Sequence, residues 1–167
     1  MALLLDADGL IKLHRAGVLM HVVRAFACSV PLTVYEEVVT RGKARLHQDA
    51  EAIESVLADR VTVLAVERHE NPEPGLGAGE LGILSLLSQE RGATVVSDDR
   101  RFLTALTREG AAFLTPADMI VVLVRRGILT RDEAREALDR LRPMIRVAAY
   151  WDARQDLEPG GGSHGEN

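Results

Sequence analysis

The residues of this chain that could support chemistry are carboxylates that follow apolar runs. In "LLLDADGL" (residues 3–10), a run of leucines leads directly into Asp6. A second apolar run, "ATVV" (93–96), is followed by the polar residues Ser97, Asp98 and Asp99. If both runs are strands of one parallel sheet, their carboxyl ends lie at the same edge, where functional groups gather in open α/β sheets. The pattern therefore predicts a group of acids at one edge of a sheet.

Glu80 is an acid on the apolar side of a predicted helix. In "GELGILSLLSQE" (79–90), a turn of about 100° per residue places Glu80 in one stripe with Ile83, Leu84 and Leu87. A carboxylate that faces inward is costly unless a cation or hydrogen bonds stabilise it. The alternative is a first-turn glutamate that interacts with the helix dipole at a solvated helix end.

Glu36 and Glu37 form an adjacent pair in "PLTVYEEVV" (31–39). The two glutamates flank the apolar face of this segment at nearly equal angles, and that face consists of Val34, Tyr35, Val38 and Val39. Periodicity alone therefore does not decide which glutamate points inward. An exposed pair on a helix is the alternative interpretation.

Each acid also has a purely structural interpretation, because Asp6, Asp8 or one residue of "SDD" could cap a helix. Helix capping does not explain all of these acids taken together. Four carboxylates at one sheet edge repel one another and destabilise the fold unless metal ions neutralise them. The histidines and the single cysteine, Cys28, are scattered along the chain. Oxygen ligands alone favour Mg²⁺ or Mn²⁺ over zinc.

The elements that must position these acids alternate along the chain. Short apolar runs alternate with longer segments of helical period, which indicates an α/β fold with a parallel sheet. The predicted strands are residues 2–5, 61–66 and 93–96. The predicted helices cover residues 8–16, 18–27, 33–41, 46–58, 79–91 and 100–109. A helical hairpin follows, with Gly127 ending its first helix and a capping box of Thr130 and Glu133 starting the second.

The composition suits one domain with a hydrophobic core, since 47% of the 167 residues are hydrophobic and 27% are charged. We expect residues 1–150 to form this domain and residues 151–167 to be an extension with a largely disordered, glycine-rich tail.

A net charge of -5 argues against a broadly basic surface for nucleic acids. The single cysteine, the absence of a signal-peptide pattern and the short apolar runs predict a cytoplasmic protein without membrane association.

The order of these motifs resembles the PIN-domain family of metal-dependent ribonucleases over about residues 2–147. The resemblance is carried by the strand that ends in Asp6, "VYEEV" (34–38), "GAGE" (77–80) and "SDDRRF" (97–102). It implies a three-layer α/β/α PIN-like fold with a central, mainly parallel sheet. With Glu rather than Asp, the "GAGE" form resembles a branch of PIN-like proteins distinct from the commonest VapC toxins.

Position by position, the resemblance implies four catalytic acids, Asp6, Glu37, Glu80 and Asp99. It implies one or two Mg²⁺ or Mn²⁺ ions held by Asp6, Glu80 and Asp99, with Glu37 binding directly or through water. Ser97 matches the small hydroxyl position of the family, and Asp98 is an accessory acid. Arg100 and Arg101 are candidates for contacts with RNA phosphates, because a site made of acids does not attract RNA by itself.

The implied function is that of a metal-dependent endoribonuclease that hydrolyses phosphodiester bonds in single-stranded RNA. A metal-activated water would attack in line while the metal stabilises charge on the phosphoryl oxygens. The resemblance further implies the toxin of a toxin-antitoxin pair, an antitoxin protein as partner and a homodimer.

Two alternatives remain open at the level of sequence, and a third, a dinucleotide-binding loop, does not fit. A PIN-like module that binds RNA or a protein partner without cutting could carry the same acids, which are necessary for catalysis but not sufficient. "LLLDADGL" also resembles the first motif of haloacid-dehalogenase-type phosphatases, with Asp6 as nucleophile and Asp8 as general acid. That family usually has threonine where this chain has Leu10, and it needs a lysine after a middle strand, whereas Lys43 precedes the second predicted strand. The glycines of "GLGAGE" (75–80) do not match the dinucleotide-binding pattern GxGxxG.

Overall fold

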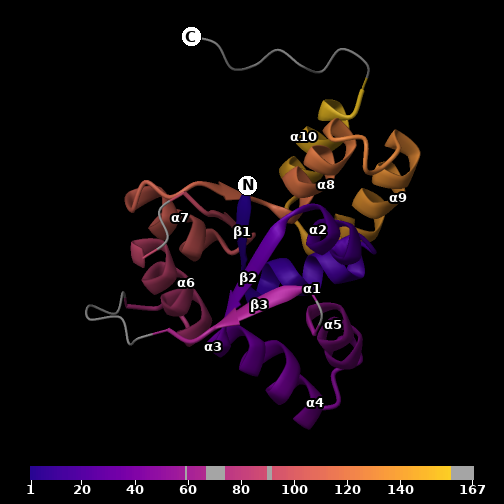
Figure 1. Cartoon of the computed structure of the whole chain (residues 1–167). Coiled ribbons are helices and arrows are strands. Elements are labelled where there is room, and N and C mark those ends of the chain that lie inside the picture. The colour runs from indigo at the N-terminus through magenta and orange to yellow at the C-terminus, as the bar shows by residue number, and fades with distance from the viewer. Residues whose placement is uncertain (59, 67–73, 90–91, 159–167) are drawn as a thin grey trace.

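The computed structural model of the chain describes residues 1–58, 60–66, 74–89 and 92–158 (Figure 1). Within these residues, five parallel strands form one sheet in the order β3-β2-β1-β4-β5. The strands are β1 (Ala2–Leu5), β2 (Ala27–Pro31), β3 (Val61–Leu64), β4 (Thr94–Val96) and β5 (Phe113–Leu114). The predicted α/β fold with a parallel central sheet is confirmed.

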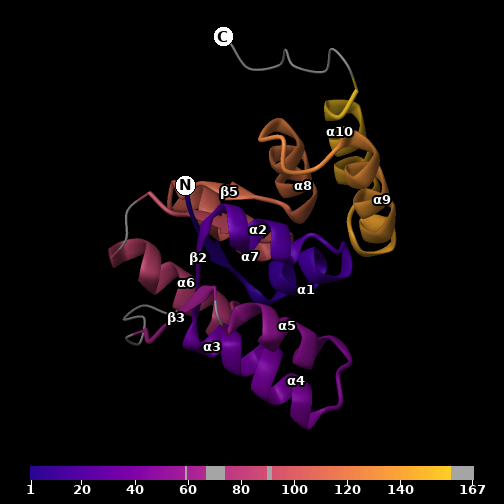
Figure 2. The same cartoon turned by 45° about the vertical axis from the view of Figure 1, so that its right-hand side comes forward.

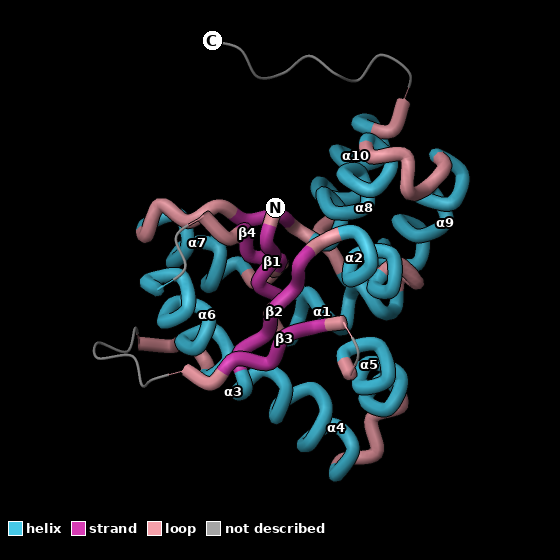
Figure 3. The backbone as a smooth tube through the Cα atoms, in the orientation of Figure 1, coloured by secondary structure: helices cyan, strands magenta, loops and turns pink. Residues whose placement is uncertain are grey.

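Helices cover both faces of this sheet (Figures 1 and 3). One face carries α6 (Ala78–Gln89) and α7 (Arg100–Arg108). The other face carries α1 (Ala7–Arg15), α2 (Leu19–Ala25), α5 (Asp49–Leu57) and α8 (Pro116–Arg125). The fold is therefore the three-layer α/β/α arrangement implied by the PIN resemblance.

The residues of β1 alternate between the two hydrophobic cores, as neighbouring residues of a strand must. Leu4 packs in the core under α6 and α7, together with Ile83 and Phe102. Leu3 and Leu5 pack in the larger core on the opposite face. All three leucines are buried, so β1 is apolar throughout because both of its faces are covered.

The segment predicted as one helix over residues 33–41 is a helix with a wide turn in its middle. It consists of α3 (Leu32–Tyr35), a π-helical turn (Glu36–Thr40) and α4 (Arg41–Ala44). The amide of Arg41 donates to the carbonyl of Glu36, which is the five-residue spacing of a π turn.

The predicted helical hairpin is confirmed as α8 followed by α9 (Arg131–Leu141). Gly127 follows the first helix with a φ of +68°, a conformation that glycine adopts without strain. Thr130 and Glu133 form the predicted capping box. A short 3-10 helix (Arg142–Met144) and α10 (Val147–Asp156) complete this part of the chain.

Two strands, β2 and β5, and one helix, α10, are not predicted from the sequence. Strand β2 reads "ACSVP", where the apolar run is interrupted, and β5 has only two residues, so neither gives a strand pattern. Helix α2 ends at Ala25, two residues before the predicted end of that helix. The domain boundary predicted at residue 150 falls inside α10, and residues 159–167 lie outside the described residues.

No helix in the described part of the chain is both long enough and apolar enough to span a membrane.

Candidate metal-binding site at the carboxyl edge of the sheet

Asp6 lies immediately after β1 and is the N-cap of α1, where its side chain accepts a hydrogen bond from the amide of Gly9. Only 3% of Asp6 is exposed. Burial raises the pKa of Asp6 to about 7, although hydrogen bonds from Ser97 and Gly9 act to lower it. The negative charges of Asp8 and Glu80 raise this pKa further. Asp6 is therefore a buried carboxylate whose negative charge is not fully compensated.

Ser97 connects Asp6 to Asp99 at the end of β4. It is completely buried, its side chain hydrogen-bonds to Asp6, and its Oγ accepts the amide of Asp99 at 3.2 Å. Asp99 is the exposed N-cap of α7, and its Oδ1 accepts the amides of Arg101 and Phe102, each at 2.9 Å. The hydroxyl group of Ser97, at the end of β4, therefore holds both Asp6 and Asp99 in place.

Glu80 is the acid that links the other three. It lies half-buried in the first turn of α6, and its Oε2 accepts the amide of Gly77 at 2.6 Å. Burial raises the pKa of Glu80, the Gly77 hydrogen bond lowers it, and the charges of Asp99 and Glu37 raise it. Since Glu80 also raises the pKa of Asp6, all four acids predicted to be catalytic interact electrostatically through this side chain.

The structure distinguishes Glu37 from Glu36, which the sequence does not. Both side chains are exposed. Glu37 acts on the pKa of Glu80, and its Oε2 lies 3.5 Å from where a Cβ at Gly79 would be. Glu37 therefore faces the start of α6, where Glu80 lies.

Two glycines allow the chain to pack this closely around the acids. A Cβ at Gly9 would lie 2.3 Å from the carbonyl oxygen of Val96 and 2.9 Å from Oδ1 of Asp6. A Cβ at Gly79 would lie 2.9 Å from Cγ2 of Val34. These glycines let α1 approach the end of β4 and let α6 approach α3.

Lys12 also lies at this edge, a position that the sequence alone does not predict. Its Nζ lies 2.8 Å from Oδ2 of Asp8 and 2.8 Å from Oδ2 of Asp98. Burial acts to lower the pKa of Lys12, but hydrogen bonds and ion pairing with both carboxylates raise it overall. Oδ1 of Asp98 is buried and has no hydrogen-bond partner among the described residues. The spacing of four between Asp8 and Lys12 could have indicated their pairing, but the contact with Asp98 joins residues far apart in sequence.

The two arginines after Asp99 have different environments. Nη1 of Arg101 donates to the carbonyl of Gly75 at 3.0 Å, and its charge lowers the pKa of Glu80. Arg101 therefore holds the backbone just before α6. Arg100 is exposed in the first turn of α7. Phe102, which follows Arg101, is completely buried in the core under α6 and α7.

The chemistry of these ligands suits a hard divalent cation, because every candidate donor is a carboxylate or hydroxyl oxygen. The raised pKa of Asp6 reports a negative charge that a cation would compensate. As placed, however, no group of three or more acids, histidines or cysteines in the described residues is close enough to hold a metal ion. Three of the acids instead accept backbone amides: Asp6 from Gly9, Glu80 from Gly77, and Asp99 from Arg101 and Phe102.

Comparison with known proteins decides between the two families that "LLLDADGL" resembles. The model of a family described as PIN domain matches residues 2–149. No curated protein and no solved structure gives a significant match to the chain. The family match covers most of the sequence, including all four linked acids. The chain therefore belongs to the PIN-domain family.

Proposed function

We propose that this protein is a metal-dependent endoribonuclease that hydrolyses phosphodiester bonds in single-stranded RNA. Membership of the PIN-domain family supports nuclease-type chemistry. The observation that supports a metal-dependent ribonuclease in particular is the electrostatic coupling of Glu80 to Asp6, Glu37 and Asp99. This coupling indicates that acids from four separate segments of the chain lie near one another at one edge of the sheet.

In this proposal Asp6, Glu80 and Asp99 hold Mg²⁺ or Mn²⁺, and Glu37 lies at the exposed rim of the site. When bound, such a cation activates water and stabilises negative charge on phosphoryl oxygens. Burial raises the pKa of Asp6 to about 7, so Asp6 would release a proton on binding a cation near neutral pH. To bind the cation, the side chains of Glu80 and Asp99 would have to give up hydrogen bonds from the backbone amides that they accept now.

Several other residues position this site rather than bind the cation. Ser97 holds Asp6 and Asp99 in a fixed relation, and Arg101 fixes the backbone at Gly75 before α6. Lys12 pairs with both Asp8 and Asp98 and offsets one of their two negative charges, although the charge of Asp8 still raises the pKa of Asp6. Arg100 is exposed beside Asp99 and is placed to contact an RNA phosphate.

The first test is cleavage of end-labelled single-stranded RNA with Mg²⁺, with Mn²⁺ or with EDTA. We expect cleavage by the wild-type protein with either metal and none in EDTA. Asp99→Asn should abolish cleavage while leaving the fold intact, because asparagine caps a helix about as well as aspartate.

The adjacent glutamates provide a matched control for this test. Glu37→Gln should lower cleavage by at least tenfold, whereas Glu36→Gln should leave it unchanged, because only Glu37 interacts with Glu80. Equal cleavage by the Asp99→Asn protein and the wild type would contradict the proposal.

A non-catalytic PIN-like module that binds RNA or a protein partner is the second candidate. The observation that favours it is that Asp6, Glu80 and Asp99 already serve as acceptors for backbone amides. Metal-independent RNA binding without any cleavage would support this candidate. The toxin role, the antitoxin partner, the homodimer and the cytoplasmic location stay predictions.

A further inference from the structure

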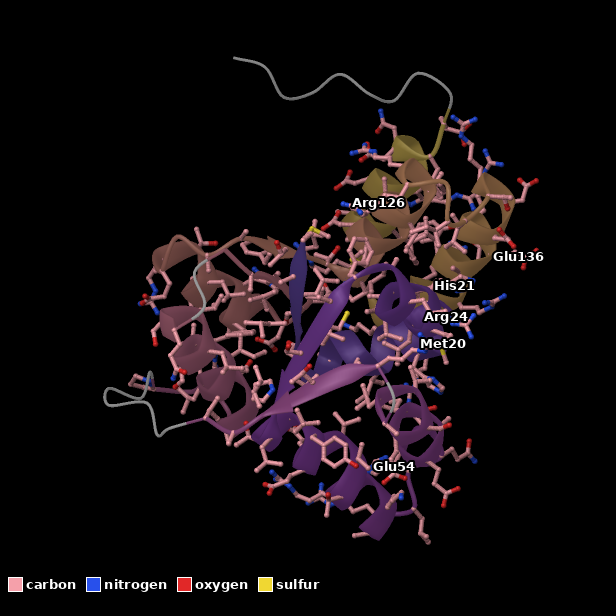
Figure 4. The ribbon with its side chains drawn as sticks, viewed as in Figure 1. Met20, His21, Arg24, Glu54, Arg126 and Glu136 are labelled. Atoms are coloured by element: carbon pink, nitrogen blue, oxygen red, sulfur yellow. The ribbon has the colours of Figure 1, made fainter. Side chains whose placement is uncertain are left out.

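A second site of opposite charge lies away from the acids. A cleft of about 540 Å³ between α2 and the segment after α8 is lined by His21, Arg24, Ala25, Arg126 and Ile128. Its basic side chains are labelled in Figure 4. Arg24 precedes the first residue of β2, whereas the acids follow the last residues of strands. The cleft therefore lies at the amino edge of the sheet, opposite the acidic site.

The basic side chains of this cleft are available to a ligand. His21 and Arg24 are three residues apart on α2 and so share one side of that helix. Arg24 and Arg126 are exposed, and neither forms an ion pair or a hydrogen bond with a carboxylate in the described part of the chain. By contrast, the neighbouring Arg125 is paired with Asp156 at 3.1 Å. Arg24 and Arg126 thus line one cleft without a paired carboxylate in the described part of the chain.

One acid does act on the edge of this cleft. The charge of His21 contributes to lowering the pKa of Glu133, for which the main cause is the hydrogen bond from the backbone of Thr130. The Oε2 atom of Glu133 accepts both the amide and the hydroxyl of Thr130, each at 2.8 Å. Glu133 is therefore committed to capping α9 and does not neutralise the two arginines.

The remaining features of the cleft suit a nucleotide. The guanidinium of Arg126 lies 4.8 Å from the centroid of the Phe26 ring, a cation–π contact that favours this orientation. A guanidinium held in this way can bind a phosphate through two hydrogen bonds, and its free face can stack on a base. Ala25 and Ile128 provide apolar contacts for a base or a ribose.

We propose that this cleft binds the sugar-phosphate backbone of single-stranded RNA, with Arg24 and Arg126 contacting phosphates. The inference deepens the proposed nuclease function and rests on it for the identity of the ligand. A strand passing over an open cleft fits the exposure of these side chains better than an enclosed small molecule does. The chain has a net charge of -5 and its acidic edge repels RNA, so binding energy must come from a basic surface elsewhere.

The test compares RNA binding by variants that change charge equally. Fluorescence anisotropy measures binding of a labelled RNA of about 16 nucleotides in EDTA, where no cleavage occurs. The double variant Arg24→Gln/Arg126→Gln should bind about tenfold more weakly than the wild type. Loss of two phosphate contacts should also reduce the slope of log K against log salt by about 1.4.

Arg41 and Arg45 provide the matched control. Both are exposed, have no carboxylate partner among the described residues, and lie at α4, away from α8 (Figure 2). The variant Arg41→Gln/Arg45→Gln loses the same charge and should bind RNA within about twofold of the wild type. The variant Arg24→Lys/Arg126→Lys should recover only part of the lost affinity, because lysine restores the charge but not the paired hydrogen bonds or the stacking of a guanidinium; this partial recovery separates a loss of contacts from a loss of folding.

The outcomes separate this inference from the nuclease proposal. Equal loss of affinity in both glutamine double variants would overturn the cleft assignment, because general electrostatics would then explain binding. An unchanged affinity in Arg24→Gln/Arg126→Gln, or no RNA binding by the wild type, would overturn it as well. Binding that depends on Arg24 and Arg126 in a protein that cleaves nothing would support the cleft and contradict the nuclease.

Discussion

Asp6 combines two roles that make opposite demands on its charge. As an N-cap it accepts the amide of Gly9, which favours the ionised carboxylate, while burial favours the neutral form. Burial dominates, so the pKa is raised from 3.8 to about 7. The folded protein therefore binds this proton more tightly than the unfolded chain does. The stabilisation that results is complete below about pH 4 and is lost as the pH rises through about 7.

The Asp6→Asn variant should remove this pH dependence. Asparagine can still accept the Gly9 amide but has no charge to bury. At about pH 8 and in EDTA, the free energy of unfolding of the variant should exceed that of the wild type by roughly 2–4 kcal/mol. At about pH 4 the two proteins should be equally stable, because Asp6 is then protonated. Urea denaturation at both pH values measures the difference, and a difference that does not change with pH would contradict this account.

Gly9 is the second residue whose substitution gives a clear result. Replacing a helical glycine with alanine ordinarily stabilises a protein by about 1 kcal/mol. At this position the added Cβ would lie 2.3 Å from the carbonyl oxygen of Val96. We therefore expect Gly9→Ala to destabilise the protein by about 1–3 kcal/mol, since α1 must move away from β4. Thermal denaturation measures the change, and any stabilisation would show that α1 does not approach β4 this closely.

At the scale of elements, the π turn explains why periodicity fails for the two glutamates. An ideal α-helix over this segment would place Glu36 and Glu37 symmetrically about the apolar face. The bond from the amide of Arg41 to the carbonyl of Glu36 widens the turn and changes the direction of the residues within it. π turns are frequent at functional sites, and this one carries the acid that interacts with Glu80.

The contact between α6 and α3 should control the geometry of the acids. Gly79→Ala would place a Cβ 2.9 Å from Cγ2 of Val34, so α6 must shift and take Glu80 with it. We expect a loss of about 1–3 kcal/mol in the free energy of unfolding and a weaker stabilisation by Mn²⁺. Gly77→Ala is the control, because its Cβ would make only an ordinary contact, 3.6 Å from Oε2 of Glu80. Equal effects of the two substitutions on stability and Mn²⁺ response would show that close helix packing is not the cause.

At the scale of the whole molecule, the acidic edge makes the stability of the protein depend on divalent cations. A cation that binds only the folded state stabilises it by RT ln(1 + [L]/Kd), or about 2.7 kcal/mol at 100 times Kd. We expect Mn²⁺ and Mg²⁺ to raise the melting temperature of the wild type near neutral pH. NaCl at equal ionic strength should have a smaller effect, because the acids are partly buried and weakly screened.

The Asp6→Asn and Asp99→Asn variants provide the controls for this measurement. Both should keep the fold but lose most of the rise in melting temperature with Mn²⁺. Differential scanning calorimetry with and without EDTA measures the effect. An equal rise in the wild type and in both variants would place the cation elsewhere on the molecule.

The sequence by itself determined those features that depend on residues close together in the chain. These include the strand that delivers Asp6, the helix that begins near Glu80, the glycine that ends α8 and the capping box that starts α9. Each of them follows from hydrophobic period, helix capping or backbone conformation, which act within a few residues. The order of the acids also indicated the family, which the family match confirmed.

Only the tertiary structure decided the features that join distant segments. The pairing of Lys12 with Asp98 spans 86 residues, and the basic cleft combines α2 with the segment after α8. Strand β5 is too short, and the apolar run of β2 is too interrupted, for a strand to be predicted from the sequence. Both form because they pair with neighbouring strands. The physical reason is the same in each case. Ion pairing, burial and strand pairing depend on distances between residues that are far apart in the sequence. Folding sets these distances, so local sequence patterns do not predict them.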